Sequence, residues 1–242
     1  MYRATYNGES VITKLTLKDA AWNPQTEFVP NSVFNVHSTR QAVAIGNGES
    51  RTEFNLMLLK NHKGGLLGAN RLQTYGCNAL YRDFTPDFLV AVGDEIVSEI
   101  SRSDYAKGNI VYAHADAVLD HPGKFYLIPQ NVYYNAGALA AYLACFDGHS
   151  RVYLMGYDSY DDISAINNVY KDTRGYQHTS NIHKQTGNYW EKSLAQVMET
   201  YADVEFVRIS PTEGWWTPDL WKSYPNFRAI SYADFVIEAD LG

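Results

Sequence analysis

The first residues with the chemistry of a binding site lie in the sequence AVAIGNGESR, where an apolar run meets a glycine-rich turn. Gly46 and Gly48 can adopt positive φ and let a ligand approach the main chain closely. Asn47 and Ser50 can add side-chain hydrogen bonds, and a helix beginning behind the turn would favour negative charge. This segment, the Gly46–Ser50 turn, therefore predicts a site for a phosphorylated ligand. The alternative is a tight strand-to-helix turn with Ser50 as the helix cap.

The Gly46–Ser50 turn matches neither of the common phosphate-binding motifs. It lacks the third glycine of the dinucleotide fingerprint and the Gly-Lys-Ser/Thr end of a P-loop. A second turn, in TYGCNALYRD, places Asn78 directly after another apolar run. Because an amide there must find hydrogen-bond partners, Asn78 is either a helix cap or a ligand contact. Both turns are expected at the carboxyl ends of strands, where open parallel sheets bind ligands.

A third group of candidate side chains lies in a long loop, residues 157–188. Loops of this length in a compact domain are usually either functional or disordered. Its tyrosines, histidines and basic residues suit hydrogen bonds to an anionic ligand, so we interpret the loop as a lid, with a solvated insertion as the alternative. These side chains are Tyr157, Tyr160, Tyr170, Lys171, Arg174, Tyr176, His178, His183 and Lys184.

The scaffold for these side chains follows from the apolar runs that alternate with helix-length segments from residue 41 onward. Such runs are typical of strands in a parallel sheet covered on both faces. A helix is expected from about Glu53, and the clearest helical patterns span residues 135–147 and 187–202. The pattern predicts an α/β fold: a Rossmann-like, mostly parallel sheet with helices on both faces. The predicted strands are residues 42–46, 71–77, 87–93, 109–113, 124–128, 151–156 and 203–209.

Residues 1–40 follow a different pattern and are predicted to be an appendage to the domain formed by residues 41–242. Alternating apolar and polar residues around Asn7-Gly8 predict a β-hairpin. The following WNPQTEFVPNS is interrupted by prolines, which predicts an irregular strap. With 242 residues the chain can bury one full sheet with its covering helices, and it shows no internal repeat.

Composition narrows the classes of function. The net charge of −7 disfavours a general nucleic-acid binder, whereas a small phosphorylated ligand needs only local donors. No apolar run approaches the roughly 20 residues of a membrane span, and no secretory signal is evident, so we expect a cytoplasmic protein. Cys77 and Cys145 are expected to be buried, reduced thiols. The 19 tyrosines and 5 tryptophans suit a sugar or nucleotide surface, a core, or the interface of a homo-oligomer.

A family resemblance enters with the stretch NAGALAAYLACFDGHSRVYLMGYDSYD, which begins at Asn135. Together with the two turns, it resembles the bacterial sialyltransferases of the Campylobacter lipooligosaccharide type and related proteins similar to archaeal 6-hydroxymethylpterin diphosphokinase. The resemblance is a pattern of motifs over roughly residues 41–210, and the family has Ser or Thr where this chain has Ala136. It implies that a CMP-sugar places its phosphate and ribose at the Gly46–Ser50 turn. The predicted nucleotide-binding residues are Gly46, Asn47, Gly48, Ser50, Asn78, Asn135, Ala136, Gly137 and Asp158.

The resemblance also implies catalytic residues. The family places two tyrosines on the departing phosphate, which match Tyr160 and Tyr170, with Tyr176 as a substitute. It uses a histidine before a small hydroxyl residue as general base, which matches His178 in preference to His183. These roles suit the residue types, because histidine titrates near neutral pH and tyrosine hydroxyls can donate to phosphate oxygens. The remaining histidines have no ligand-like spacing and are interpreted as surface or capping residues: His37, His62, His114, His121 and His149.

The predicted function is sialyltransferase-like glycosyl transfer from a nucleotide sugar, of CMP type, to a carbohydrate-type acceptor hydroxyl, with no other cofactor. One alternative is Mg²⁺-dependent diphosphoryl transfer to a pterin-type alcohol, in which Asp158, Asp161 and Asp162 could hold the metal; we favour a site without metal. A second alternative is a non-catalytic nucleotide-binding protein. The tryptophan-rich segment 213–225 could form an acceptor subsite, but anchoring of the C-terminus or a subunit interface is favoured.

Overall fold

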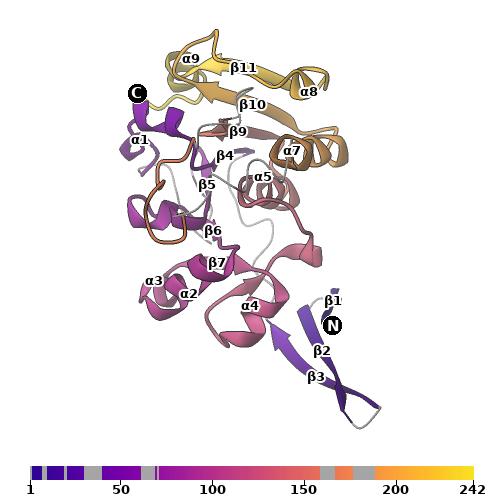
Figure 1. Ribbon diagram of the computed structural model, residues 1–242. Helices are drawn as coiled ribbons and strands as arrows, with labels where there is room; N and C mark the ends of the chain where they lie inside the picture. Colours follow the sequence, from indigo (N-terminus) through magenta and orange to yellow (C-terminus); the bar gives the residue numbers. More distant parts are fainter. Residues whose placement is uncertain are drawn as a thin grey trace.

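The computed structural model describes residues 2–6, 10–18, 21–29, 40–60, 69, 71–158, 167–176 and 189–242 (Figure 1). Its main feature is one eight-stranded sheet in which every neighbouring pair of strands is parallel. The seven predicted strands all lie in this sheet. In chain order its strands are β4 (Gln41–Ile45), β5 (Gln73–Cys77), β6 (Phe88–Val90), β7 (Ile110–Ala113), β8 (Tyr126–Leu127), β9 (Arg151–Met155), β10 (Glu205–Ser210) and β11 (Phe227–Ser231).

The order of the strands across the sheet is β11-β10-β9-β4-β5-β6-β7-β8. From β4 the chain first adds strands on one side, as far as β8, and then returns to add β9, β10 and β11 on the other side. The strand order therefore reverses between β4 and β9. In open α/β sheets this topological switch point leaves a crevice outside the carboxyl ends of the strands, where ligands bind.

Helices cover both faces of the sheet, as the sequence pattern predicts for a Rossmann-like fold. Figure 1 shows α5 and α7 on one face and α1 and α2 on the other. None of the helices in the described ranges has the length and apolar character needed to cross a membrane. The helices are α1 (Met57–Lys60), α2 (Asp94–Arg102), α3 (Tyr105–Gly108), α4 (Ala115–Asp120), α5 (Ala136–Phe146), α7 (Tyr189–Thr200), α8 (Asp219–Lys222) and α9 (Tyr232–Glu238), with 3₁₀ turns η1 (Glu49–Glu53), η3 (Asn78–Arg82) and η4 (Pro129–Asn131).

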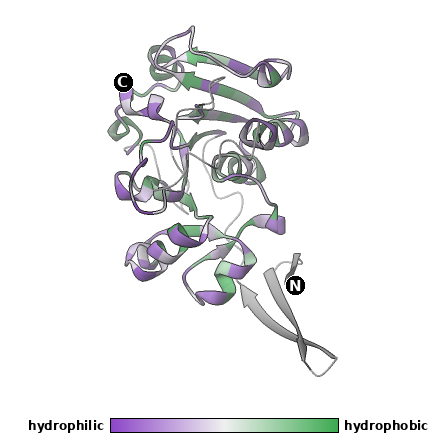
Figure 2. Ribbon diagram, in the orientation of Figure 1, coloured by the Kyte–Doolittle hydropathy of each residue, from purple (hydrophilic) through white to green (hydrophobic). Residues whose placement is uncertain are grey.

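The core has two parts because alternate residues of each strand point to opposite faces. In β4, Val43 and Ile45 pack in the cluster that contains the buried residues of α2 and α9. Ala42 and Ala44 pack in the other cluster, with α5 and α7. Both faces of the strand are fully buried, which explains its continuous apolar sequence. Figure 2 shows the same apolar character in the central strands and in α5.

Helix α5 owes its position to small residues. It is apolar all round, with the sequence AGALAAYLACF, and it lies between the sheet and α7, so nearly all of its surface is buried. Alanines at the contact with β4 and β5 let the helix approach the sheet closely. The preceding residue, Asn135, caps the helix by accepting a hydrogen bond from the backbone N–H of Ala138 at 3.0 Å. This cap fixes where the helix begins, at the carboxyl edge of the sheet.

Three details differ from the prediction. The helix expected from about Glu53 is reduced to the short helix α1, and the 3₁₀ turn η1 precedes it, beginning at Glu49 within the Gly46–Ser50 turn. The strap predicted over WNPQTEFVPNS is largely a strand, β3 (Ala21–Val29), which pairs antiparallel with β2 (Ser10–Lys18). Pro24 is tolerated there because β3 is an edge strand. The last strand, β11, was not predicted, because it is an edge strand that is only partly buried.

The predicted N-terminal hairpin is present. Strand β1 (Tyr2–Tyr6) pairs antiparallel with β2, and together with β3 they form a second, three-stranded sheet. Figure 1 shows this sheet beside α4, away from the switch point of the main sheet.

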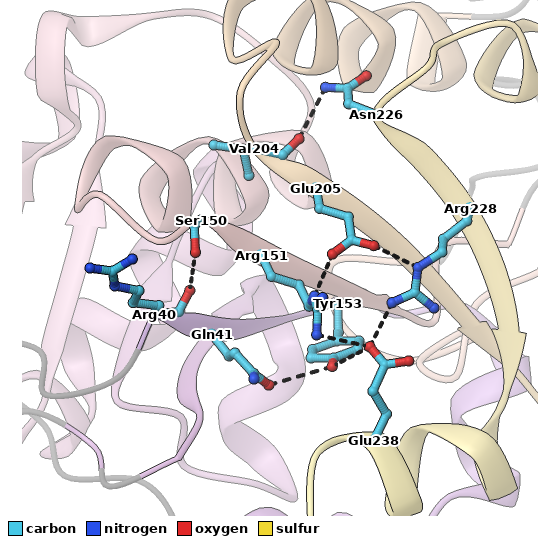
Figure 3. A network of polar contacts seen from close by, with 10 residues as sticks. All are labelled: Arg40, Gln41, Ser150, Arg151, Tyr153, Val204, Glu205, Asn226, Arg228 and Glu238. Carbon is cyan, nitrogen blue, oxygen red and sulfur yellow. Dashed lines mark hydrogen bonds and ion pairs between the residues drawn. The ribbon is translucent and has the colours of Figure 1, made fainter.

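A network of ion pairs joins β9, β10, β11 and α9 at the amino edge of the main sheet (Figure 3). Arg151 bonds Glu205 at 2.5 Å and Glu238 at 3.0 Å. Arg228 on β11 bonds the same two carboxylates, at 2.6 and 2.5 Å. The network ties the C-terminal strand and helix to the sheet at the edge opposite the strand ends that carry the candidate site.

Candidate functional site

The main cavity of the described structure lies at the switch point. It has a volume of about 240 Å³ and opens at the carboxyl ends of β9, β4 and β5, with the N-terminus of α5 as one wall. All of the predicted nucleotide-binding residues line it except Ser50, which is buried. The cavity-lining members of the predicted set are Gly46, Asn47, Gly48, Asn78, Asn135, Ala136, Gly137 and Asp158.

The two glycines of the Gly46–Ser50 turn are required by the neighbouring strand end. A Cβ on Gly46 would lie 2.5 Å from the carbonyl oxygen of Gly156, and one on Gly48 would lie 2.6 Å from the same atom. The backbone N–H of Gly46 donates to Met155 at 2.8 Å, and that of Gly48 donates to Gly156 at 2.9 Å. The glycines therefore allow the ends of β4 and β9 to pack against each other, a role that needs no ligand.

The next two amides of the turn are also engaged. The backbone N–H of Glu49 donates to the side-chain oxygen of Asn167 at 2.6 Å. The N–H of Ser50 donates to one carboxylate oxygen of Asp158 at 2.7 Å, and the Ser50 hydroxyl donates to the other at 2.5 Å. A phosphate cradle needs amides that point at the ligand. Here these amides bind protein oxygens, so the turn faces the cavity with the side chain of Asn47 instead.

Asp158 is an internal anchor of this turn. Its side chain is 1% exposed and lies 3.8 Å from the guanidinium of Arg208, a buried residue of β10. Arg208 also donates to the Thr217 hydroxyl at 2.6 Å and to the carbonyl oxygen of Trp216. The tryptophan-rich segment 213–225 is thus fixed to the core through Arg208. Both oxygens of the Asp158 carboxylate are therefore engaged within the protein, although the residue lines the cavity.

Polar side chains from three segments meet on one wall of the cavity. Asn47 donates through Nδ2 to the carbonyl oxygen of Cys77 at 3.3 Å and to the hydroxyl of Tyr176 at 3.4 Å. Asn78 also hydrogen-bonds Tyr176, and its Oδ1 accepts from the N–H of Val92 at 2.9 Å. Burial raises the pKa of Tyr176 to about 12, so its hydroxyl keeps its proton. The Oδ1 atom of Asn47 is buried and has no partner among the described residues.

The N-terminus of α5 forms another wall of the cavity. Its first residues Ala136 and Gly137 line the cavity, and the first N–H groups of a helix have no partners within the helix. Asn135 supplies a partner to Ala138 alone, and through Nδ2 it donates to the carbonyl oxygen of Trp190 at 3.3 Å. Helix N-termini bind anions through such amides and through the helix dipole. This wall therefore has the affinity for negative charge that was expected of the Gly46–Ser50 turn.

Aromatic rings complete the cavity. The hydroxyl of Tyr157 donates to the carbonyl oxygen of Gly137 at 2.6 Å, which holds its ring against α5. Trp221 is buried, and its ring N–H donates to the carbonyl oxygen of Glu191 at 2.9 Å. Trp190 is 41% exposed at the cavity. The spacing of Trp190 from Leu194 fits the apolar stripe of a helix and gives no sign that its ring lies beside a cavity.

The predicted lid is in contact with the turn through residues 167–176, here called the 167–176 segment. The N–H of Val169 donates to the carbonyl oxygen of Asn47 at 2.8 Å, and Lys171 pairs with Glu49 at 2.6 Å. Asn167, which the sequence did not single out, lines the cavity. The segment therefore forms one wall of the cavity and brings Tyr176 to Asn47 and Asn78.

The predicted catalytic residues are not all placed at the cavity. Tyr170 is buried away from it: its hydroxyl donates to Asp83 at 2.5 Å and accepts from Arg51 at 2.7 Å. Tyr176, the predicted substitute, does line the cavity. Tyr160 and His178 lie outside the described residues, as does His183. Their assignment stays a prediction.

The fold and the site define an α/β protein of Rossmann-like architecture with a polar, aromatic-lined cavity at the switch point of its sheet. A scan against protein-family models and searches of curated proteins and of solved structures found no match to the chain. The chemistry of the cavity is therefore the basis for assigning a function.

Proposed function

We propose that the main cavity binds a nucleotide-type ligand and that the protein transfers a sugar from a nucleotide donor, of CMP type, to an acceptor hydroxyl. The observation that carries the proposal is the position of the α5 N-terminus, whose first residues face a cavity at the topological switch point. Among the described lining residues there is no lysine or arginine. The phosphate of the ligand would therefore bind the amides of Ala136 and Gly137 and the dipole of α5.

The remaining walls suit the other parts of a nucleotide. The amides of Asn47 and Asn78 and the hydroxyl of Tyr176 offer donors and acceptors for a ribose or for the edge of a base. Trp190 presents an exposed ring on which a base or a sugar can stack. The cavity thus combines an apolar surface with a few convergent polar groups, as small-molecule sites generally do.

Glycosyl transfer requires stabilisation of the leaving phosphate and a base for the acceptor hydroxyl. The α5 N-terminus stabilises negative charge where it develops, and the Tyr176 hydroxyl, which keeps its proton, can donate to a phosphate oxygen. Tyr160 as a second donor and His178 as the base stay predictions from the family resemblance.

The carboxylate of Asp158 bears on the choice between this reaction and Mg²⁺-dependent diphosphoryl transfer. That alternative was based on Asp158, Asp161 and Asp162 as metal ligands. Both Asp158 oxygens accept hydrogen bonds from Ser50, and Arg208 lies beside them. If this carboxylate bound a metal, it would lose its hydrogen bonds from Ser50 and the turn would be disrupted. We therefore favour glycosyl transfer, which needs no metal at Asp158.

A thermal-shift panel of CMP, CDP, UDP, GDP and ATP, each with and without Mg²⁺, tests the proposal. We expect CMP to raise the melting temperature without metal, because a ligand that binds the folded state stabilises it. Stabilisation by ATP only with Mg²⁺ would favour the diphosphokinase alternative. No shift with any nucleotide would overturn the proposal.

A pair of glycine variants locates the binding site. A Cβ on Gly137 would meet its neighbours at 3.4 Å, so Gly137→Val adds bulk to the cavity with no severe clash at its Cβ. Gly108 at the end of α3 has nothing within 4 Å of its Cβ position, and Gly108→Ala is the matched control. We expect Gly137→Val to abolish the CMP shift and Gly108→Ala to retain it. A retained shift in both variants would place CMP elsewhere.

A further inference from the structure

A second cavity lies beside the main one on the same edge of the sheet. It has a volume of about 160 Å³, and Val92, which follows β6, lines both cavities. It opens where β6 and β7 end, between the starts of α2 and α4. Its titratable lining residues are Asp94, His114, Asp116, Asp120 and His121.

His114 is the half-buried member of this group that follows β7 directly. Its ring stacks on that of Tyr133, with centroids 4.4 Å apart and planes inclined by 13°. Its Nδ1 lies 3.4 Å from Oδ1 of Asn131. The stack and this contact together fix the orientation of the imidazole, although His114 has no ligand-like spacing in the sequence.

The partners of Asn131 define which ring nitrogen of His114 carries the proton. The backbone N–H of Ala115, which can only donate, contacts the same Asn131 atom at 3.2 Å, so that atom is the amide oxygen. The amide nitrogen donates to the Tyr133 hydroxyl at 3.3 Å. Because an oxygen acceptor faces Nδ1, the neutral ring holds its proton there. Nε2 is then left with the lone pair that can accept a proton.

The environment keeps this imidazole neutral at physiological pH. Burial lowers the pKa of His114 below its usual 6.5, while Asn131 and the nearby carboxylate of Asp116 act in the opposite direction. The other ionisable side chains around the second cavity are the exposed carboxyl groups of Asp94 and Asp120 and the imidazole of His121. Carboxylates at the rim can accept hydrogen bonds from the hydroxyl groups of a sugar.

The two cavities adjoin, because Val92 lines both of them. In a nucleotide sugar the anomeric carbon is bonded to the phosphate, so a nucleotide held by Asn47 and the α5 N-terminus keeps this carbon near the phosphate. An acceptor in the second cavity would approach the anomeric carbon past Val92. We infer that the second cavity binds the acceptor alcohol, a neutral polyhydroxylated molecule, and that His114 is the general base of the transfer.

This inference rests on the proposed function and assigns to a described residue the role predicted for His178. In the transfer, Nε2 of His114 takes the proton of the acceptor hydroxyl while the hydroxyl oxygen bonds to the anomeric carbon of the donor sugar. The bond from that carbon to the phosphate oxygen breaks, and its electron pair leaves with CMP.

The test uses the full chain with CMP-sialic acid as donor and methyl β-galactoside as acceptor, and follows the release of CMP. His114→Gln removes the proton acceptor, and we expect the transfer rate to fall by at least ~100-fold with unchanged affinity for CMP. The wild-type rate should decrease as the pH falls through the pKa of His114, because protonation removes the base. The residual rate of the variant should lack this dependence.

Imidazole NMR of the wild-type protein gives a second, activity-independent test. We expect the Nδ1–H tautomer for His114 and a shift of its ring signals when methyl β-galactoside is added to the CMP complex. Unmoved His114 signals, or a His114→Gln variant with the wild-type rate, would refute the inference.

Comparison with His178→Gln separates the two proposals. If that variant loses the transfer while His114→Gln retains it, the base assignment is wrong and the proposed function stands. If the wild-type protein fails to bind CMP, the proposed function is overturned, whereas a His114 shift with methyl β-galactoside alone would still support the second cavity as a sugar site.

Discussion

At the scale of single residues, Asp158 illustrates how a carboxylate beside a cavity can serve the fold. It is 1% exposed, both of its oxygens accept hydrogen bonds from Ser50, and it lies near the buried cation of Arg208. Removing one member of a buried pair leaves the other charge without compensation, which costs far more than the loss of an exposed pair.

We therefore predict that Asp158→Ala lowers the free energy of unfolding by about 3 kcal/mol, because Arg208 and two hydrogen-bond donors of Ser50 lose their partner. Asp219→Ala is the matched control: its ion pair with Lys222 spans 3.0 Å but its side chain is 98% exposed, so no measurable change is expected. Urea denaturation of both variants measures the effect. Equal stability of the two variants would contradict the internal role of Asp158.

The residues of the site could be predicted in part. Gly46, Asn78 and Asp158 were placed together because the carboxyl ends of parallel strands meet at one edge of a sheet. The use of the amides of Glu49 and Ser50 could not be predicted, since it depends on Asn167 and Asp158 arriving from more than 100 positions further along the chain. A single histidine forms no spacing pattern with other residues, so a functional role for His114 could not be predicted from the sequence.

At the scale of elements, the 167–176 segment connects the main cavity to a cluster on the other side of the turn. The hydroxyl of Tyr170 bonds Asp83 and Arg51, and the guanidinium groups of Arg51 and Arg82 lie 5.4 and 5.7 Å from its ring centre. Arg82 also donates to the Thr173 hydroxyl at 2.9 Å. These contacts hold the segment in the position that delivers Tyr176 to the cavity.

Tyr170→Phe keeps the ring next to the two guanidinium groups and removes the hydroxyl. We expect a loss of about 1–3 kcal/mol in stability, faster hydrogen exchange in the 167–176 segment, and weaker CMP binding because Tyr176 is less well held. Hydrogen exchange with mass spectrometry and calorimetry measure these changes. If Tyr170 instead donates to the phosphate, as the family resemblance implies, CMP binding weakens without any change in exchange.

The elements themselves were largely predictable wherever burial is complete. The strands from β4 to β10 have apolar runs because both of their faces are covered. Prediction was wrong at β3, where prolines suggested an irregular strap. It also missed β11, which contains Arg228 and Ser231 and has no fully buried residue. Both are edge strands, in which the local sequence is less constrained by packing.

At the scale of the whole molecule, the network at the amino edge of the sheet makes stability depend on pH. The hydrogen bond from Arg228 holds the pKa of Glu238 below its usual 4.5. A carboxylate whose pKa is lowered by folding contributes stability that is present above the unfolded value and lost as the pH falls through the folded value. Lowering the pH therefore weakens the ion pairs that attach β11 and α9 to the sheet.

We predict that the melting temperature of the wild-type protein decreases between pH 5 and pH 3. Glu238→Gln should make this decrease shallower by about the contribution of one carboxylate, because residue 238 no longer titrates. Calorimetric scans across this range measure both slopes. Identical slopes would show that the network does not contribute to acid sensitivity.

The engagement of the turn amides has an evolutionary consequence. A cradle made of backbone N–H groups recognises its ligand whatever the side chains are, and point mutations rarely alter it. In the main cavity the variable contacts come from the side chains of Asn47, Asn78, Tyr176 and Trp190, each of which a single codon change can replace. Ligand preference at this site is therefore expected to drift readily between homologous proteins, while Gly46 and Gly156, fixed by the packing of two strand ends, stay the same.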